Sequence, residues 1–186
     1  MRIISGDYKN KKLFLPLDQK TRPLRDLVKE SIFNLIEHSK KININLREAY
    51  ILDLFSGSGS FGIECLSRRV RKVVFLENYL GAIKILEKNL KLLSYNSNYE
   101  IINDDFFKFF ETKNTINIKF DIIFIDPPYK EFKINKIIET IKTNKLLNES
   151  GIIILHRHKK NNIKLSDKIK IIENRSYGIS NIFFIN

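Results

Sequence analysis

Apolar residues form two kinds of segment that alternate from residue 50 to residue 155. Continuous apolar runs are typical of strands buried on both faces of a parallel sheet, and apolar residues three or four apart are typical of helices. The runs predict strands at residues 50–55, 72–76, 99–102, 120–125 and 151–155. The spaced stripes predict helices at residues 60–68, 80–93, 106–110 and 134–147. Strands that alternate with helices predict a parallel sheet with right-handed crossovers.

The beginning of the chain has a different pattern. Short apolar segments at residues 2–5 and 12–15 flank a polar turn, which predicts a hairpin. Apolar residues then recur at helical spacing from Val28 to Ile36. We therefore expect a basic N-terminal extension of residues 1–47, made of a hairpin and a helix, ahead of a main domain of residues 48–186.

The end of the chain departs from the alternation as well. Apolar runs near residues 169–172 and 182–185 flank Tyr177-Gly178 with no helical stripe between them. This pattern predicts an antiparallel hairpin at the edge of the sheet. The whole chain is therefore predicted to be an α/β protein with a mostly parallel, seven-stranded sheet.

The apolar run at residues 120–125 ends abruptly in Asp126-Pro127-Pro128-Tyr129. Pro127 has no N–H for a sheet ladder, and Pro128 restricts it further, so the strand has to stop at Asp126. Open α/β sheets bind their ligands at the carboxyl ends of their strands. Asp126 is therefore a candidate ligand-binding carboxylate on a stiff backbone, with the flat ring of Tyr129 close by.

A glycine turn follows the strand predicted at residues 50–55. Gly57 and Gly59 precede a predicted helix, where glycine lets a ligand approach the backbone and the amino end of the helix. No Gly-Lys-Ser/Thr follows, which excludes a phosphate-binding P-loop. Together with Gly62, the spacing also matches a dinucleotide fingerprint, so an NAD-dependent enzyme stays an alternative. Asp53, inside the strand end, can hold an ammonium group or an ordered water molecule.

Acidic residues also stand at the ends of the next two predicted strands. Glu77 lies about 20 residues after the glycine turn, where a carboxylate can accept hydrogen bonds from ribose hydroxyls. Asp105 and Phe106 follow the strand at residues 99–102 and suit the amine and the ring of adenine. Asp105 is equally well interpreted as a helix N-cap.

The charge of the chain points to a polyanionic partner. The 33 Lys and Arg against 21 Asp and Glu give a net charge of +12, and residues 1–47 hold 11 of the basic and 5 of the acidic residues. Nucleic acid is a more natural partner for such a surface than a membrane. The alternative is that the high Lys, Ile and Asn content only reflects an AT-rich coding sequence.

Few other residues suggest a cofactor or a compartment. Cys65 is the single cysteine, which excludes an internal disulfide and a cysteine-based zinc site and fits a reducing cytoplasm. No apolar run approaches the roughly 18–20 residues that span a bilayer, and no signal peptide is visible. His156 and His158 lack an evident third ligand, so we expect no metal site and interpret residues 156–160 as a solvated or RNA-facing basic turn.

The order of these motifs carries a resemblance to a known class of enzymes. The segment from Asp53 to Gly59, then Glu77, Asp105 and Asp126-Pro127-Pro128-Tyr129, resembles the class I S-adenosylmethionine-dependent methyltransferases. The resemblance implies their Rossmann-like fold. The Asp-Pro-Pro-Tyr form is similar to that of enzymes that methylate adenine or guanine amines.

The N-terminal blocks narrow the resemblance to one family. Residues 2–6, 11–13, 22–23 and 26–34 are similar to the RsmD family, whose members methylate the exocyclic amine of a guanine in bacterial 16S ribosomal RNA. The similarity extends from Arg2 to Tyr177-Gly178. Leu24 and Leu27 depart from it, because the family usually carries a threonine and an arginine there.

The resemblance implies a role for each motif. Asp126 and the Pro127 carbonyl accept from the guanine amine, and Tyr129 stacks on a base that is splayed out of the RNA. The implied catalytic residues are Asp126, Pro127, Pro128 and Tyr129. The implied S-adenosylmethionine-binding residues are Asp53, Phe55, Gly57, Gly59, Glu77, Asp105 and Phe106. The RNA-binding residues expected from the basic N-terminal segment are Arg2, Lys9, Lys11, Lys12, Arg22, Arg25 and Lys29.

The implied setting is a cytoplasmic monomer that acts on ribosomal RNA, either free or in an assembling small subunit, with no membrane partner. A DNA adenine-amine methyltransferase stays an alternative, although the chain has little room for a target-recognition region. A non-enzymatic RNA-binding module is a second alternative, but it leaves the acids at the strand ends without a role.

Overall fold

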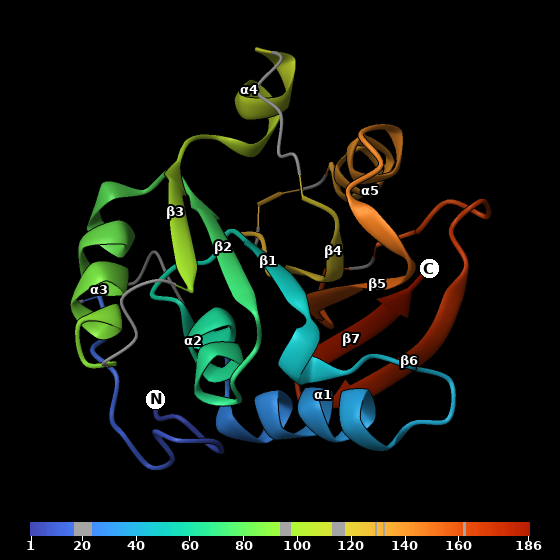
Figure 1. The fold of residues 1–186 in the computed structure, drawn as a ribbon. Helices are drawn as coiled ribbons and strands as arrows, with labels where there is room; N and C mark the ends of the chain where they lie inside the picture. Colours follow the sequence, from blue (N-terminus) through green and yellow to red (C-terminus); the bar gives the residue numbers. More distant parts are fainter. Residues whose placement is uncertain (17–23, 94–97, 113–117, 129, 132, 162) are drawn as a thin grey trace.

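A twisted seven-stranded sheet lies between two layers of helices (Figure 1). The structure is a computed structural model that describes residues 1–16, 24–93, 98–112, 118–128, 130–131, 133–161 and 163–186. The strands follow the order β3-β2-β1-β4-β5-β7-β6. Their bounds are β1 (Tyr50–Leu54), β2 (Lys72–Glu77), β3 (Tyr99–Asn103), β4 (Phe120–Ile125), β5 (Leu147–His158), β6 (Ile171–Tyr177) and β7 (Ser180–Ile185).

The directions of the strands confirm the predicted sheet. Strands β1 to β5 pair in parallel, whereas β7 is antiparallel to both of its neighbours, β5 and β6. A dinucleotide-binding sheet has the order 3-2-1-4-5-6, without an antiparallel strand inserted before the last one. The strand order therefore argues against the NAD-dependent alternative.

The helices divide between the two faces of the sheet. One face is covered by α1 (Asp26–His38), α2 (Ser60–Ser67) and α3 (Leu80–Leu90), and the other by α4 (Phe106–Glu111) and α5 (Ile134–Thr143). A short 3₁₀ helix, η1 (Leu46–Glu48), precedes β1. Among the described residues, no helix is both long enough and apolar enough to cross a bilayer.

An aromatic stack joins the N-terminal helix to the sheet. The ring of Phe33 in α1 stacks on Phe61 of α2 with 5.3 Å between centroids, and Phe61 stacks on Phe124 of β4 at 4.1 Å. All three side chains are buried. Helix α1 is therefore part of the same hydrophobic core as α2 and the centre of the sheet.

Strand β5 is longer at both ends than its apolar run predicts. It begins at Leu147, which pairs with Phe120 of β4, so α5 ends at Thr143 and not at residue 147. At its other end β5 continues to His158 because residues 156–158 pair with β7. These polar residues are strand because of distant backbone partners, which the local pattern does not encode.

The predicted N-terminal hairpin is present, but as a single bridge between Arg2 and Lys12 and not as two strands. The carboxylate of Glu64 in α2 fastens this hairpin, because its oxygens accept from the backbone N–H groups of Ile4 at 2.7 Å and Ser5 at 2.9 Å.

The Lys29 ammonium of α1 lies 3.4 Å from Glu64 and donates to the Arg2 carbonyl at 2.7 Å. Both charged side chains are fully buried. One buried ion pair thus joins the hairpin, α1 and α2.

Two uncharged side chains add to this attachment. The Ser67 hydroxyl accepts from the Tyr8 N–H at 3.0 Å, and the Asn89 side chain accepts from the Phe14 N–H at 2.7 Å and donates to the Phe14 carbonyl at 3.1 Å. Gly6 has φ +82°, and a Cβ there would lie 1.9 Å from the Ser67 carbonyl oxygen, so only glycine fits. The division at residue 47 stays a prediction.

We expect Glu64→Gln to lower the free energy of unfolding by about 3 kcal/mol, because it leaves the buried Lys29 ammonium without a counter-charge. Adding Lys29→Met should restore part of the loss, since it removes that charge. Denaturant unfolding followed by circular dichroism measures both values.

The matched control is Glu37→Gln. Glu37 pairs with Arg68 at 2.6 Å but is 36% exposed, so its loss should cost at most about 1 kcal/mol. Equal losses for the two glutamine variants would contradict the role given to the Lys29–Glu64 pair.

Candidate functional site

Asp126 lies at the carboxyl end of β4, as the sequence predicts. Its backbone N–H reaches the Leu54 carbonyl of β1 at 3.5 Å, and its side chain is 26% exposed. Pro127 is buried and Pro128 is exposed. Tyr129, which the sequence places in the same site, lies outside the described residues. Asp126 is thus a partly open carboxylate at the edge where ligands of such sheets bind.

Three carboxylates meet at this edge of the sheet. Strand β1 pairs in parallel with both β2 and β4, which brings Asp53, Glu77 and Asp126 to neighbouring strand ends. Burial raises the pKa of Asp53 well above its usual range, a hydrogen bond from the Gly62 N–H opposes the shift, and the charges of Asp126 and Glu77 add to it. Asp53 is only 1% exposed and accepts from Gly62 at 2.9 Å. It therefore lies beneath the glycine turn and not in an open cleft.

Glu77 ties the glycine turn to the end of β2. One of its carboxylate oxygens accepts from the Gly57 N–H at 2.8 Å, and the other accepts from the N–H groups of Asn78 and Tyr79, each at 2.9 Å. Gly59 has φ +83°, and a Cβ there would lie 2.4 Å from the Leu86 side chain, so the turn requires glycine. The turn and the acid form one connected unit.

Asp105 is the N-cap of α4. Its Oδ1 accepts from the N–H groups of Phe107 at 3.0 Å and Lys108 at 3.1 Å, and its Oδ2 accepts from the Asn78 side chain at 3.2 Å. The N-cap interpretation is thus confirmed, and the second oxygen links the ends of β3 and β2.

The two aromatic residues assigned to cofactor binding differ in exposure. Phe106 is 1% exposed, and its ring lies 6.2 Å, centroid to centroid, from the half-buried Phe55. The side chain of Phe106 therefore belongs to the hydrophobic core. Phe55 stands directly after β1 with φ 57°, beside the glycine turn.

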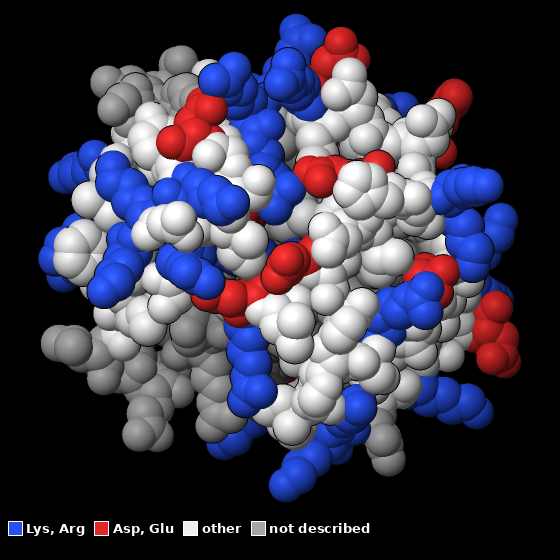
Figure 2. Space-filling model, turned by 90° about the horizontal axis from the view of Figure 1, so that it is seen from below, with Lys and Arg blue, Asp and Glu red and all other residues white. Residues whose placement is uncertain are grey.

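The predicted RNA-binding residues divide between the surface and the interior. Lys9, Lys12 and Arg25 are exposed, and Arg2 is exposed with its Nε 3.2 Å from Asp26 Oδ2. Figure 2, seen from the side of α1, shows Lys and Arg side chains over much of this face with acidic side chains among them. Arg22 lies outside the described residues.

Two of the predicted lysines have structural partners. Lys29 is 0% exposed and pairs with Glu64, so the prediction that it contacts RNA is wrong. The helical stripe around it hid this, because a lysine on an apolar face is ordinarily solvated. The Lys11 ammonium bonds to the Leu92 carbonyl and lies 5.2 Å from the centroid of the Tyr8 ring, which leaves it partly buried.

His156 was not predicted as a site residue, yet it contacts Asp126. Its Nδ1 lies 2.8 Å from Asp126 Oδ1, and its Nε2 lies 2.9 Å from the Ser180 hydroxyl of β7. The interpretation of residues 156–160 as a solvated or RNA-facing basic turn is therefore wrong for His156, which lies in β5 and is 17% exposed, and for Arg157, which is 3% exposed. The rule that selected the acids at the strand ends would have found His156, because this residue directly follows the apolar run of β5.

Arg157 holds the segment that follows Asp126. Its Nη1 donates to the carbonyls of Pro127 at 3.3 Å and Pro128 at 3.2 Å, and its Nη2 donates to the Glu131 carbonyl at 3.0 Å. The side chain is 3% exposed. A buried guanidinium on the adjacent strand thus fixes the backbone carbonyls of Pro127, Pro128 and Glu131.

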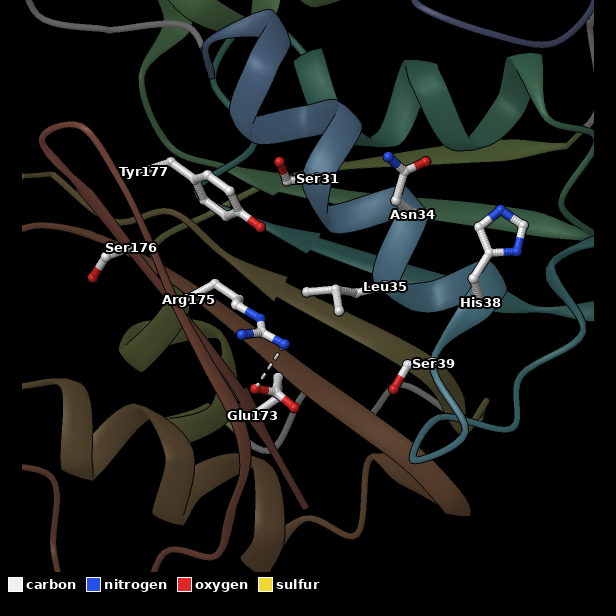
Figure 3. A pocket seen from close by; sticks show the side chains of 9 residues that line it. All are labelled: Ser31, Asn34, Leu35, His38, Ser39, Glu173, Arg175, Ser176 and Tyr177. Atoms are coloured by element: carbon white, nitrogen blue, oxygen red, sulfur yellow. Dashed lines mark ion pairs between the residues drawn. The ribbon is translucent and has the colours of Figure 1, made fainter.

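A separate groove of about 770 Å³ lies between α1 and β6 (Figure 3). Ser31 and His38 line it from the helix, and Arg175 and Tyr177 line it from the strand. Arg175 pairs with Glu173 across its floor at 3.4 Å. None of the acids at the strand ends lines this groove.

The sequence of this chain is similar to a known family and to several known proteins. A family model described as "Conserved hypothetical protein 95" matches residues 1–186. Ribosomal RNA small subunit methyltransferase D of Haemophilus influenzae is 30% identical over 96% of this chain and 90% of that protein. The protein of the same name from Buchnera aphidicola subsp. Acyrthosiphon pisum is 34% identical over 87% of this chain and 80% of its own.

Solved structures agree with the fold. A Haemophilus influenzae protein superimposes with a TM-score of 0.75 and 30% identity, over 99% of this chain and 96% of that one. An Escherichia coli protein gives a TM-score of 0.80 at 24% identity, over 100% and 96%. The rRNA methyltransferase AviRa of Streptomyces viridochromogenes gives 0.69 at 12% identity, over 90% and 87%, and this similarity concerns the fold alone.

Arg157→Lys should speed exchange of the Glu131 amide, which donates to the Pro128 carbonyl at 2.9 Å, because the single nitrogen of a lysine cannot take the places of both guanidinium nitrogens that hold the carbonyls of this segment. We expect about a tenfold increase, since hydrogen bonds to a charged group contribute roughly 1.5–3 kcal/mol. Hydrogen–deuterium exchange read by mass spectrometry measures it. Arg175→Lys, at a 49% exposed arginine of β6, is the matched control and should leave the segment unchanged. The same rate in wild type and Arg157→Lys would show that the clamp has no effect.

Proposed function

Because the chain belongs to the family of ribosomal RNA small subunit methyltransferase D, the RsmD family, we propose that it methylates ribosomal RNA with S-adenosylmethionine as methyl donor. The proposed target is the exocyclic N2 amine of a guanine in small-subunit (16S) RNA. The observation that carries the proposal is the Asp126 carboxylate, which stands partly exposed at the end of β4 beside the Pro127 carbonyl. The family relationship supports RNA over DNA as the substrate, and the basic charge supports a nucleic acid in general.

The chain has the side chains that an adenosine cofactor with an amino-acid tail requires. We assign Glu77 to the ribose hydroxyls and Asp105 to the adenine amine, because carboxylate oxygens accept from both kinds of donor. The turn at Gly57 and Gly59 would hold the amino-acid part through its backbone. Asp53 lies below the turn and accepts from the Gly62 N–H, so we assign it to support the backbone that binds this part of the cofactor. When bound, S-adenosylmethionine supplies an electrophilic methyl group on a sulfonium.

Asp126 and Pro127 are assigned to the substrate amine. A guanine amine is a poor nucleophile because its lone pair is delocalised into the ring. If the Asp126 carboxylate and the Pro127 carbonyl accept its two N–H bonds, the nitrogen is fixed and its lone pair is directed at the methyl group. The Pro127 carbonyl has two lone pairs, so its bond to Arg157 leaves one for the substrate.

The base has to leave its stack to reach this edge of the sheet. We assign Tyr129 to stack on the splayed guanine, as aromatic side chains do with unstacked bases in RNA. The exposed cations at Arg2, Lys9, Lys12 and Arg25 are proposed to contact phosphates. We further propose that the protein acts as a monomer in the cytoplasm, on free RNA or on an assembling small subunit.

We expect Asp126→Asn to lower kcat for methyl transfer at least a hundredfold, because an amide loses the charge that holds the amine. The dissociation constant for S-adenosylmethionine should change less than threefold. Radiolabelled methyl transfer to small-subunit RNA from a strain that lacks this enzyme measures the first value, and calorimetry the second. Asp167→Asn, at an exposed acid of the segment after β5, is the control and should keep wild-type activity. Full activity of Asp126→Asn would falsify the mechanism.

Lys9→Ala combined with Lys12→Ala should weaken RNA binding and reduce its dependence on salt. Each lost phosphate contact lowers the slope of log K against log salt by roughly 0.7–0.9. Lys11 is left in place because it bonds to Leu92 within the protein. Binding to a small-subunit RNA fragment is measured by fluorescence anisotropy at several salt concentrations. The control is Lys168→Ala with Lys170→Ala, two exposed lysines before β6, and a slope that falls equally in both variants would refute a specific role for the hairpin.

A further inference from the structure

The imidazole of His156 is built into the catalytic edge of the sheet. In the β4–β5 register Ile125 lies opposite Leu155, so Asp126 and His156 each follow the last pair of the ladder. Both ring nitrogens have partners, Nδ1 with Asp126 at 2.8 Å and Nε2 with Ser180 at 2.9 Å. Ser180 is itself 5% exposed. A side chain held at both nitrogens has a fixed orientation.

We propose that His156 is a positioning residue for methyl transfer: it fixes the Asp126 carboxylate through Oδ1 so that Oδ2 faces the substrate amine, and it supports the reaction best when its imidazole is neutral. This inference rests on the proposed function, since it deepens the role of Asp126 in that reaction. It adds a residue on a second strand to the Asp-Pro-Pro-Tyr segment.

The first support is that the two oxygens of the Asp126 carboxylate differ in their hydrogen-bond partners. Oδ1 is taken by His156, and within the described residues no hydrogen bond reaches Oδ2. Arg157, the next residue along β5, fixes the backbone after Asp126 through the carbonyls of Pro127 and Pro128. With the backbone held, the freedom left to Asp126 is rotation of its side chain, which the bond to His156 removes. Fixing a hydrogen-bond acceptor before the substrate arrives is a source of rate enhancement.

The second support is the charge around the imidazole. Burial lowers the pKa of His156, but the charge of Asp126 and its hydrogen bond raise it by more, while the charge of Arg157 lowers it; the net pKa lies above its usual value. Among the described residues, the charges that act on His156 are thus those of Asp126 at the end of β4 and of Arg157, the next residue of β5, and from β7 the imidazole meets the uncharged Ser180.

The sign of the pH effect follows from this pairing. Below the pKa of His156, the imidazolium forms an ion pair with Asp126. This pair offsets the negative charge of the carboxylate that is proposed to hold the substrate amine. Above that pKa, the neutral ring still donates its Nδ1–H to Oδ1, while Nε2 accepts from the Ser180 hydroxyl. Methyl transfer should therefore rise with pH as His156 loses its proton, whereas the ion pair stabilises the fold at acidic pH and that contribution is lost as pH rises through the raised pKa.

The test compares three variants of the full chain with wild type. His156→Asn keeps an N–H donor near the position of Nδ1 but does not titrate. We therefore expect kcat within about threefold of wild type at high pH, and we expect the fall of kcat at acidic pH (the acid limb of the pH profile) to disappear. His156→Leu keeps the bulk without a donor, and kcat should fall at least tenfold with an unchanged dissociation constant for S-adenosylmethionine. His158→Asn, two residues along β5, should keep the wild-type profile.

Several results decide the question. An acid limb that persists unchanged in His156→Asn, or wild-type kcat in His156→Leu, would overturn the proposal. If His156→Leu does not fold, the pH profile of His156→Asn decides alone. NMR titration of the His156 ring should give a pKa that falls on Asp126→Asn, and an unchanged value would also overturn the pairing. A wild-type protein that transfers no methyl group to ribosomal RNA would instead sink the proposed function, while the NMR titration would still report on the pair.

Discussion

The crowding of carboxylates at the carboxyl ends of β1, β2 and β4 is the constraint on which the candidate site of this protein depends. Parallel pairing of β1 with β2 and β4 brings Asp53, Glu77 and Asp126 together, and the raised pKa of Asp53 reflects that proximity in addition to its burial. Each of the three carboxylates has its own hydrogen-bond donors. Asp53 accepts from the backbone of α2, Glu77 accepts from three backbone N–H groups, and Asp126 is paired with an imidazole. The donors hold the acids in place, and the acids in turn fix the glycine turn and the strand ends.

Much of this edge could be predicted because its determinants are local. The apolar run before Asp126 and the two prolines after it specify where β4 ends, and Gly59 marks a turn that only glycine can make. The same local reasoning places Glu77 and Asp105 at neighbouring strand ends. The prediction succeeded where spacing along the chain translates directly into position on the sheet.

The features that could not be predicted depend on contacts between segments that are distant in the sequence. His156 and Asp126 are 30 residues apart, and although His156 could have been selected as a strand-end residue, its contact with Asp126 follows from the register of β4 with β5, which no local pattern encodes. Lys29 was misassigned for a similar reason: Ile32 and Phe33 place it on the apolar face of α1, but its partner Glu64 lies on another helix 35 positions away. Nothing in a sequence distinguishes the two residues of a buried ion pair from charged residues on the surface. The N-terminal hairpin and helix were predicted, but their attachment through Glu64, Ser67 and Asn89 was not.

The antiparallel strand β7 has a consequence for the order in which the protein can be completed. Strand β6 is synthesised before β7 but borders only β7 within the described sheet, so it has no place in the sheet until the later strand has formed. Ser180, the residue that supports the imidazole beside Asp126, is the first residue of that later strand. Ile182, Phe184 and Ile185 of β7 are fully buried, so a chain still emerging from the ribosome lacks both a part of its hydrophobic core and the support of Asp126 until this strand has been made. Completion of the core and completion of the candidate site therefore depend on the same last strand.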